Sequence, residues 1–325
     1  MKNNKDLEIQ LSKILINIEW DIWSTNLTIL CLENLINSIS IFKHDSLEHF
    51  YKEFEILFYT IKNTKPKIWI IIHYISKIYD IIYDNKWKYQ NIDEIYKELD
   101  LFLKNIKKEI NTDNKNLVEK WASAINNNDT IFIHSPSSIV KQVVYKAHKS
   151  WKKIKIILAQ QSEDKTNNMI YFLQENKIEF LVIPEFMLSN IEWDIDKMLV
   201  WWVTFNSEHQ FIVSAWTNAA VSEMHYANKP VYMFLSTKKF SLWQSEANID
   251  HAVYKTKEII SVDKKINPYK RVKFSHDRVD GKLFDKIFTE IWEMNYKEIV
   301  SLYKERFVEK EEWRKTHFIQ KEKKQ

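Results

Sequence analysis

The sequence predicts an α/β protein, with a helical N-terminal domain followed by a Rossmann-like parallel sheet domain that has helices on both faces. Apolar residues recur at three- and four-residue steps through residues 7–110, which is typical of amphipathic helices. From residue 129 onward, short apolar runs alternate with helical segments, which is typical of βαβ units. The polar stretch 111–116 lies between the two patterns and is the candidate hinge.

The second half of the chain can be divided into strands and helices. The apolar runs predict strands at 130–133, 155–158, 180–183, 197–200 and 231–234. The segments between them predict helices at 137–149, 165–176, 186–191 and 216–228. We therefore expect a helical N-terminal domain at 1–115, a Rossmann-like α/β domain at 116–303 and a charged C-terminal tail at 304–325.

Thirteen Trp residues and a single glycine, Gly281, are the most unusual part of the composition. A soluble domain uses roughly 7% Gly, so about twenty glycines would be expected at this length. Trp cannot supply the positive φ or the close backbone approach that Gly allows. Several Trp residues nevertheless stand where a chain ordinarily turns or packs closely. These are Trp121, Trp151, Trp201, Trp202 and Trp216.

We interpret many of these positions as Gly in the natural protein. In some bacteria the UGA codon encodes Gly, and a translation table that reads UGA as Trp would give this pattern. The alternative is a protein that is truly rich in Trp and poor in Gly.

Charge and cysteine content limit the classes of partner. The formal net charge is +4, but residues 1–270 contain no Arg, the side chain that best reads phosphate and guanine. We therefore attribute the basic charge to solvated faces and expect no nucleic-acid partner. Cys31 is the only cysteine, so no disulfide forms within the chain. No signal-peptide core and no apolar run of 18 residues occurs, so we expect a cytoplasmic protein without a membrane partner.

Short motifs follow one another in a specific order along the chain. They are 129–138 (DTIFIHSPSS), 156–162 (IILAQQS), 200–203 (VWWV), 215–217 (AWT), 226–232 (YANKPVY) and 288–292 (FTEIW). Together with 21–24 and 64–66 upstream, these motifs resemble the initiation factor 2B alpha/beta/delta family. That family includes archaeal ribose-1,5-bisphosphate isomerases and is related to methylthioribose-1-phosphate isomerase. Several family glycines fall on Trp in this chain, among them those at Trp201 and Trp216.

The resemblance allows isomerase chemistry to be tested at individual positions. The family's isomerases use a Cys after the first strand and an Asp after the fourth, and these positions hold Ser135 and Val203 here. An Arg after the second strand is replaced by Glu163, and an Asn-Lys pair by Val213-Ser214. Because proton transfer needs a general acid–base pair, we expect no catalytic residue in this chain.

A ligand site is still expected outside the carboxyl ends of the strands, where ligands bind in doubly wound sheets. Five polar residues fall at that edge: His134, Ser135, Ser137, Gln161 and Thr217. We expect them to bind a phosphorylated metabolite or a nucleotide, without a cofactor or a metal. They are equally compatible with ordinary loop caps, Ser137 as a helix N-cap in particular.

Three functions remain open. The first is a non-catalytic initiation-factor-2B-like protein that forms a homodimer or larger oligomer, or assembles with related subunits, and senses a phosphorylated small molecule in translation regulation. The second is an aldose–ketose sugar-phosphate isomerase, of the ribose-1,5-bisphosphate or methylthioribose-1-phosphate type, with rearranged catalytic groups. The third is an unrelated binding module on the same scaffold, since fold does not fix function. The lost polar groups favour the first function over the second, and the spread of motifs favours it over the third.

Overall fold

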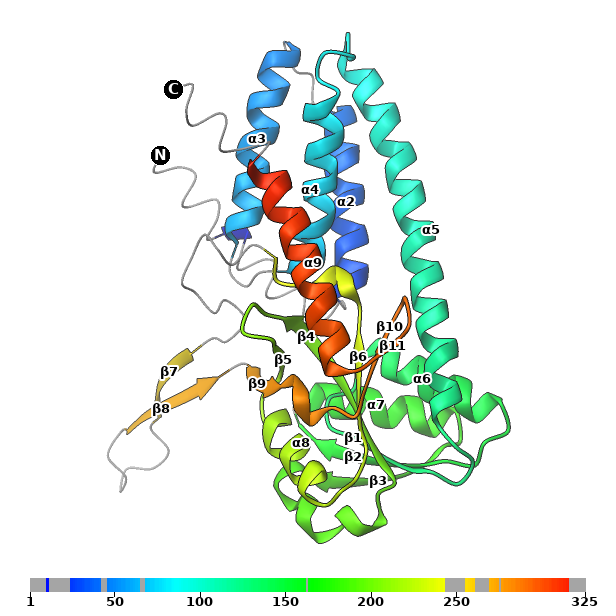
Figure 1. The fold of residues 1–325 in the computed structure, drawn as a ribbon. Helices are drawn as coiled ribbons and strands as arrows, with labels where there is room; N and C mark the ends of the chain where they lie inside the picture. Colours follow the sequence, from blue (N-terminus) through cyan, green and yellow to red (C-terminus); the bar gives the residue numbers. More distant parts are fainter. Residues whose placement is uncertain are drawn as a thin grey trace. The chain divides into compact units, whose positions relative to one another are not determined.

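The computed structural model describes residues 10–11, 24–41, 46–64, 68–161, 163–242, 255–260, 269–274 and 276–315. It confirms a mixed α/β protein with a helical N-terminal part and a mostly parallel central sheet (Figure 1). The chain divides into two compact units between Lys115 and Asn116. The candidate hinge at 111–116 is helical, because it lies inside one long helix, α5 (Ile92–Ala124).

The N-terminal unit consists of helices. They are α2 (Ser24–Ile41), α3 (Leu47–Asn63), α4 (Trp69–Asp84) and the first part of α5. Helix α4 is apolar on most of its surface, and Tyr74, Ile78 and Ile82 are fully buried. The N-cap of helix α3 is Ser46, whose side chain accepts a hydrogen bond from the His49 amide at 3.2 Å. An N-cap of this kind stabilises a helix by about 1 kcal/mol.

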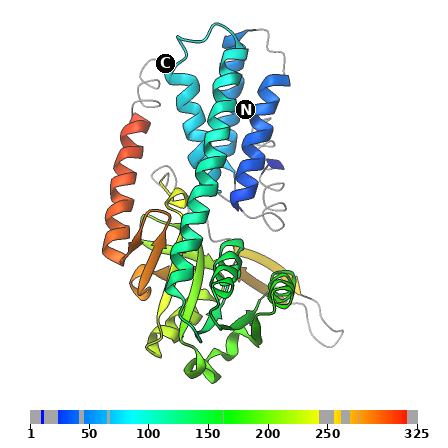
Figure 2. The same ribbon diagram turned by 90° about the vertical axis from the view of Figure 1, so that its right-hand side faces the viewer.

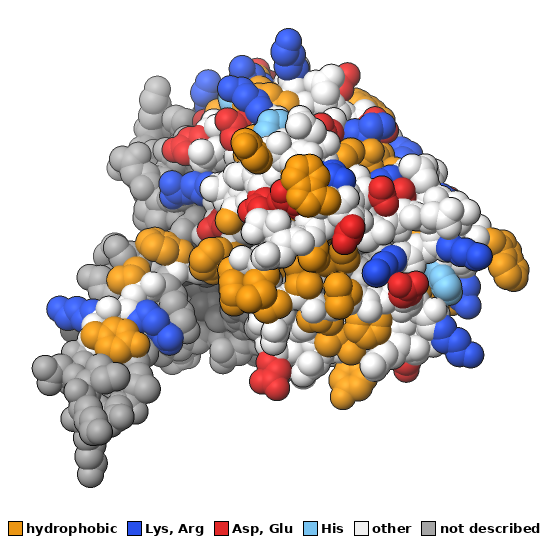
Figure 3. Space-filling view, turned by 90° about the horizontal axis from the view of Figure 1, so that it is seen from below, with side chains coloured by type: hydrophobic (Ala, Val, Ile, Leu, Met, Phe, Trp, Pro, Cys, Tyr) orange, Lys and Arg blue, Asp and Glu red, His pale blue; other side chains and the backbone are white. Residues whose placement is uncertain are grey.

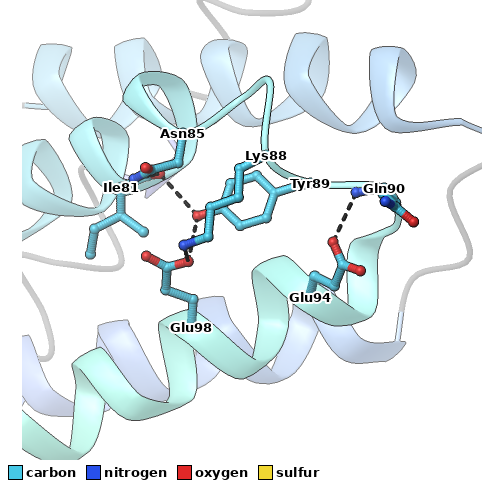
Figure 4. Close-up of polar contacts among 7 residues, drawn as sticks. All are labelled: Ile81, Asn85, Lys88, Tyr89, Gln90, Glu94 and Glu98. Carbon is cyan, nitrogen blue, oxygen red and sulfur yellow. Dashed lines mark hydrogen bonds and ion pairs between the residues drawn. The ribbon is translucent and has the colours of Figure 1, made fainter.

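The connection between α4 and α5 is fixed by the Tyr89 side chain (Figure 4). Its hydroxyl lies 3.1 Å from the Ile81 carbonyl oxygen and 2.8 Å from Glu98 Oε2. Lys88 Nζ lies 3.1 Å from the same carboxylate oxygen. Burial and the neighbouring Glu98 carboxylate both raise the pKa of Tyr89. The phenol therefore stays protonated and joins the end of one helix to the start of the next.

The second unit is built on a nine-stranded sheet. The strand order is β11-β10-β6-β4-β1-β2-β3, with β5 paired to β4 and β9 paired to β5. The pairs among β10, β6, β4, β1, β2 and β3 are parallel, and those of β11, β5 and β9 are antiparallel. The strands are β1 (Thr130–Ile133), β2 (Lys155–Gln160), β3 (Glu179–Pro184), β4 (Lys197–Phe205), β5 (Gln210–Ser214), β6 (Val231–Leu235), β9 (His276–Asp280), β10 (Lys286–Thr289) and β11 (Glu293–Met294).

The helices of this unit follow the order that the sequence predicts. The α-helices are α6 (Ser138–Lys149), α7 (Glu163–Glu175), α8 (Thr217–Tyr226) and α9 (Tyr296–Arg314). The 3-10 helices are η1 (Glu185–Asn190), η2 (Glu192–Asp194), η3 (Thr237–Lys239) and η5 (Gly281–Leu283). The helix expected at 186–191 is thus a 3-10 helix. A second, two-stranded sheet is formed by β7 (Lys255–Ile260) and β8 (Tyr269–Phe274).

Helices cover both faces of the large sheet (Figure 1, Figure 2). Alternate residues of a strand point to opposite faces. Ile131 and Ile133 of β1 belong to a buried cluster that contains side chains of α5, α6 and α7. Phe132, between them, belongs to a separate cluster that contains side chains of α8 and α9. The middle residues of the central strands are therefore apolar on both faces, as expected for a parallel sheet.

Strand β4 is longer than the sequence predicts. A strand end is expected at Val200, but β4 continues to Phe205. Its first half pairs in parallel with β1 and β6, and its second half pairs antiparallel with β5, with a bulge between Trp202 and Thr204. Residues 201–205 are aromatic and β-branched, and such side chains favour strands when a partner is available.

Helix α9 begins before the expected tail boundary at residue 304. Asn295 and Glu298 form a capping box at its start. Leu302 and Tyr303 are buried and pack in the core of the sheet. The first part of this charged segment is therefore a packed helix. Residues 316–325 of the expected tail lie outside the described residues.

Two exposed Trp residues adopt a backbone conformation that favours glycine. Trp151 has φ 63° and an exposed fraction of 94%. Trp216 has φ 68° and ψ −8°, and it occupies the N-cap of α8 without making a side-chain cap. The left-handed region costs an ordinary residue roughly 1–2 kcal/mol. Both positions therefore favour the interpretation that Gly stands here in the natural protein.

Two buried Trp residues have an unsatisfied indole donor, and one of them is also overpacked. Trp121 and Trp202 have no exposed surface, and neither indole Nε1 has a hydrogen-bond partner among the described residues. The ring centroids of Trp121 and Phe234 are 3.2 Å apart, whereas aromatic pairs usually have centroids about 4.5–7 Å apart. Overpacking and an unsatisfied donor each destabilise a core by roughly 1–3 kcal/mol. A smaller residue would remove both defects.

We predict that the codons at Trp23, Trp69, Trp121, Trp201 and Trp216 are UGA and that the host protein carries Gly at these sites. Trp23, like most of the upstream motif 21–24, lies outside the described residues. Peptide mass spectrometry of protein from the host measures the residues directly. Trp at most of the five positions would refute the interpretation.

We also predict that Trp151→Gly and Trp216→Gly each raise the free energy of unfolding by about 1 kcal/mol, because Gly adopts positive φ without strain. Trp87→Gly is the matched control, since Trp87 is 84% exposed but does not have positive φ. That change should leave stability unchanged or lower it by about 0.5–1 kcal/mol. Urea denaturation measures all three variants, and equal effects at the three sites would contradict the prediction.

Candidate functional site

Three of the five predicted site residues meet at the carboxyl edge of the sheet. His134 follows β1, Gln161 follows β2 and Thr217 begins α8. His134 Nδ1 lies 3.1 Å from Thr217 Oγ1 and 3.3 Å from Gln161 Nε2. Because β1 and β2 are parallel neighbours, their carboxyl ends place His134 and Gln161 together, and the start of α8 brings Thr217 to the same edge.

The imidazole of His134 is fully buried, and its second nitrogen faces a carboxylate. With Gln161 donating to Nδ1, the ring proton of a neutral His134 lies on Nε2. Nε2 is 3.3 Å from Oε2 of Glu185, the first residue of η1. The approach is not aligned as a hydrogen bond, and Nε2 has no other partner among the described residues. The imidazole and the carboxylate thus lie side by side at the carboxyl edge of the sheet.

Glu185 is the residue that the sequence analysis missed. The motif comparison drew attention to residues after the first, second and fourth strands, whereas Glu185 follows the third strand, β3. An acidic residue in a short loop is usually an ordinary solvent-exposed side chain. The one signal available was its place directly after a strand, at the same edge as His134 and Gln161.

Ser135 contacts the hydroxyl group of Ser214, one of the two residues that replace the Asn-Lys pair of the isomerases. Its Oγ is 2.8 Å from Oγ of Ser214, the last residue of β5. Two adjacent hydroxyl groups can donate to and accept from a ligand, but neither titrates near neutral pH. Val203, at the other position expected to be catalytic in an isomerase, lies in the bulged part of β4 and has no polar side-chain atom.

Ser137 has a structural role. It is the N-cap of α6, and its Oγ accepts a hydrogen bond from the Val140 amide at 3.1 Å. The side chain is 1% exposed. This is the helix cap that the sequence analysis kept as the alternative. The cap uses one lone pair of the Ser137 hydroxyl and leaves its proton and its second lone pair unassigned.

The N-terminus of α8 is the part of this edge best suited to a negative group. Helix N-termini present free amide groups and favour anions. The amide of Asn218 donates a hydrogen bond to Asp277 Oδ2 at 3.2 Å, so one carboxylate already occupies part of this position. Glu163, at the start of α7, is exposed. A bound phosphate would have to displace or share the place of Asp277.

Metal binding, membrane insertion and cavities are other features by which the described ranges could carry a function. No group of three or more His, Cys, Asp or Glu side chains there could hold a metal ion. None of the helices described is both long enough and apolar enough to cross a membrane. A cavity of about 230 Å³ lies in the helical unit, and its lining of α2 and α3 residues is mainly apolar, including Leu35, Phe50 and Phe54.

Three solved structures have a similar fold. A chain of the tetrameric eIF2B β2δ2 complex of C. thermophilum has a TM-score of 0.65 at 13% identity, over 93% of each chain. The eIF2B β subunit of Chaetomium thermophilum has a TM-score of 0.62 at 15% identity, over 94% of each chain. The translation initiation factor eIF-2B of Pyrococcus horikoshii OT3 has a TM-score of 0.55 at 15% identity, over 83% of this chain and 98% of that one.

Sequence comparison gives the family. No curated protein matches the chain. Identities as low as those of the solved structures show the shared fold alone. The sequence model of one family, however, matches residues 24–294, which is more than half of the chain. The chain therefore belongs to the initiation factor 2 subunit family.

Proposed function

We propose that this chain is a non-catalytic, initiation-factor-2B-like protein in the cytoplasm that assembles with copies of itself or with related chains. We further propose that it binds a phosphorylated small molecule or a nucleotide at the carboxyl edge of its sheet and acts in translation regulation. The observation that carries the ligand proposal is the contact of His134 with both Gln161 and Thr217. The similarity to a chain of a tetrameric complex supports the proposed assembly.

The chemistry of this edge suits binding. The paired hydroxyl groups of Ser135 and Ser214 and the amides at the start of α8 are neutral hydrogen-bonding groups. Such groups fix the orientation of a sugar or a phosphate without supplying a proton. A phosphate would gain from the helix N-terminus but would meet the carboxylate of Asp277. A sugar hydroxyl or a neutral base fits closest to His134, and the phosphate fits closest to α8.

The second candidate function is a sugar-phosphate isomerase with rearranged catalytic groups. One observation favours it, namely the 3.3 Å approach of His134 Nε2 to Glu185 Oε2. A His–Glu pair can act as a general acid and base. The positions that hold Cys and Asp in the isomerases that the sequence resembles cannot do so here, because they are Ser135 and Val203.

We predict that ligand binding depends on the Thr217 hydroxyl. In protein carrying Gly at positions 201 and 216, phosphosugars or nucleoside monophosphates should raise the melting temperature in a thermal-shift screen. Thr217→Val removes one hydrogen-bonding group and should weaken binding about tenfold, since such a bond contributes roughly 1–1.5 kcal/mol. Thr112→Val, at an exposed site on α5, is the matched control and should not change binding. Equal affinity in both variants would place the ligand elsewhere.

We predict no interconversion of ribose-1,5-bisphosphate and ribulose-1,5-bisphosphate, and no isomerisation of methylthioribose-1-phosphate, in protein with Gly restored. General acid–base groups each contribute roughly 10²–10⁴-fold, so their loss brings turnover near background. Ser135→Cys with Val203→Asp should not restore it, because Glu163 and Val213-Ser214 remain. A coupled assay measures turnover. Turnover that Ser135→Ala or Glu185→Gln abolishes would instead establish the isomerase.

A further inference from the structure

The start of α8 already holds one negative group that belongs to the chain itself. The amide of Asn218 donates a hydrogen bond to Asp277 Oδ2 at 3.2 Å, across 59 residues of sequence. Trp216, the N-cap of α8, provides no side-chain cap, so Asp277 takes that role from strand β9. Free amides and the helix dipole favour a carboxylate here, and they favour a phosphate for the same reason. Asp277 therefore occupies the place that the phosphate of a ligand would take.

This place adjoins the candidate ligand site. Thr217, the first residue of α8, lies 3.1 Å from Nδ1 of His134. His134 is fully buried, and its Nε2 has no hydrogen-bond partner among the described residues. Buried polar atoms are ordinarily paired, so this nitrogen indicates where a ligand group binds. Strand β9 also pairs with β5 up to Ser214, whose Oγ is 2.8 Å from that of Ser135. A ligand that contacts His134 thus lies beside the start of α8.

The charges at this edge suit a sugar better than a phosphate. Glu185 Oε2 lies 3.3 Å from His134 Nε2, so a second carboxylate is present besides Asp277. A sugar hydroxyl donates a hydrogen bond to a carboxylate, whereas a phosphate bears negative charge near neutral pH and is repelled by it. Asp277 and a ligand phosphate therefore compete for the same amides.

The surface on the η1 side of the site is apolar rather than basic. Phe186 and Met187 follow Glu185 in η1 and are 70% and 46% exposed. Figure 3 shows hydrophobic side chains gathered on this side of the molecule. Residues 179–194 contain no Lys or Arg. This segment therefore offers a phosphate no positive side chain that would offset the two carboxylates.

We propose that Asp277 determines the ligand specificity of this site by competing with a ligand phosphate for the amides at the start of α8. The site then recognises the sugar or the base of a phosphosugar or nucleotide, and the phosphate adds nothing to the affinity while Asp277 is in place. The inference rests on the proposed ligand binding and names the part of the ligand that is recognised.

Matched pairs of ligands test the competition. In protein carrying Gly at positions 201 and 216, isothermal titration calorimetry should give adenosine and adenosine monophosphate similar Kd values, and the same should hold for ribose and ribose 5-phosphate. Asp277→Asn keeps an oxygen that can accept from the Asn218 amide but removes the charge. It should tighten the binding of the two phosphorylated ligands about tenfold, because the repulsion is gone, and leave adenosine and ribose unchanged.

Asp285→Asn is the matched control. Asp285 Oδ2 accepts a hydrogen bond from the Val231 amide at 2.7 Å, at the start of β6 and so at the amino ends of the parallel strands. The same charge is removed there, but none of the four affinities should change. Asp277→Ser removes the carboxylate with a smaller side chain and should act like Asp277→Asn. Circular dichroism checks that each variant is folded.

The possible results separate this inference from the proposed function. If protein with Asp277 intact binds the phosphorylated ligands about tenfold more tightly than their partners, or if Asp277→Asn tightens both members of a pair equally, the inference is overturned and the ligand proposal stands. Absence of binding by all four ligands, with Asp277 intact and in both variants of it, would overturn the two together. Tighter binding of the phosphorylated ligands alone, in Asp277→Asn but not in Asp285→Asn, would establish Asp277 as the residue that determines specificity.

Discussion

Burial of β1, β2, β4 and β6 on both faces is the constraint on which the rest of the structure depends. Each central strand supplies alternate side chains to two separate cores, so helices must cover both sides of the sheet. Parallel strands joined by such helices all end at the same edge. That edge brings together His134, Gln161 and Thr217, which are far apart in the sequence. The candidate site is thus a consequence of how the strands are buried.

The same constraint explains which elements could be predicted. Strand β1 has the predicted bounds, and β2, β3 and β6 extend only a little further, because buried parallel strands are continuous apolar runs. Strands β5 and β9 were missed. They pair with each other across more than sixty residues, and the sequence of β9, HDRVD, is mostly polar. Such a strand is specified by its partner, so local sequence does not reveal it.

The positions of the candidate site residues were predictable where topology alone sets them. His134, Ser135, Gln161 and Thr217 could be named from the strand ends and the motifs. Glu185 could not, because its approach to His134 depends on the course of η1 after β3. Ser214 could not either, since its contact with Ser135 depends on the unpredicted strand β5. The excess of Trp over Gly was visible in the composition, but only the backbone shows that Trp151 and Trp216 require positive φ.

The change of partner along β4 divides the sheet into two hydrogen-bonded ladders. Residues 197–201 belong to the parallel ladder, whereas residues 202, 204 and 205 pair with β5, and the bulge at Val203 lies inside this antiparallel ladder. Because the two ladders use different residues of β4, and the bulge weakens the antiparallel one, the β5–β9 part can separate without breaking the parallel pairs. Amide protons of residues 197–201 and those of residues 202–205 therefore exchange with solvent through different opening events. This would make β4 a single strand shared by two cooperative folding units.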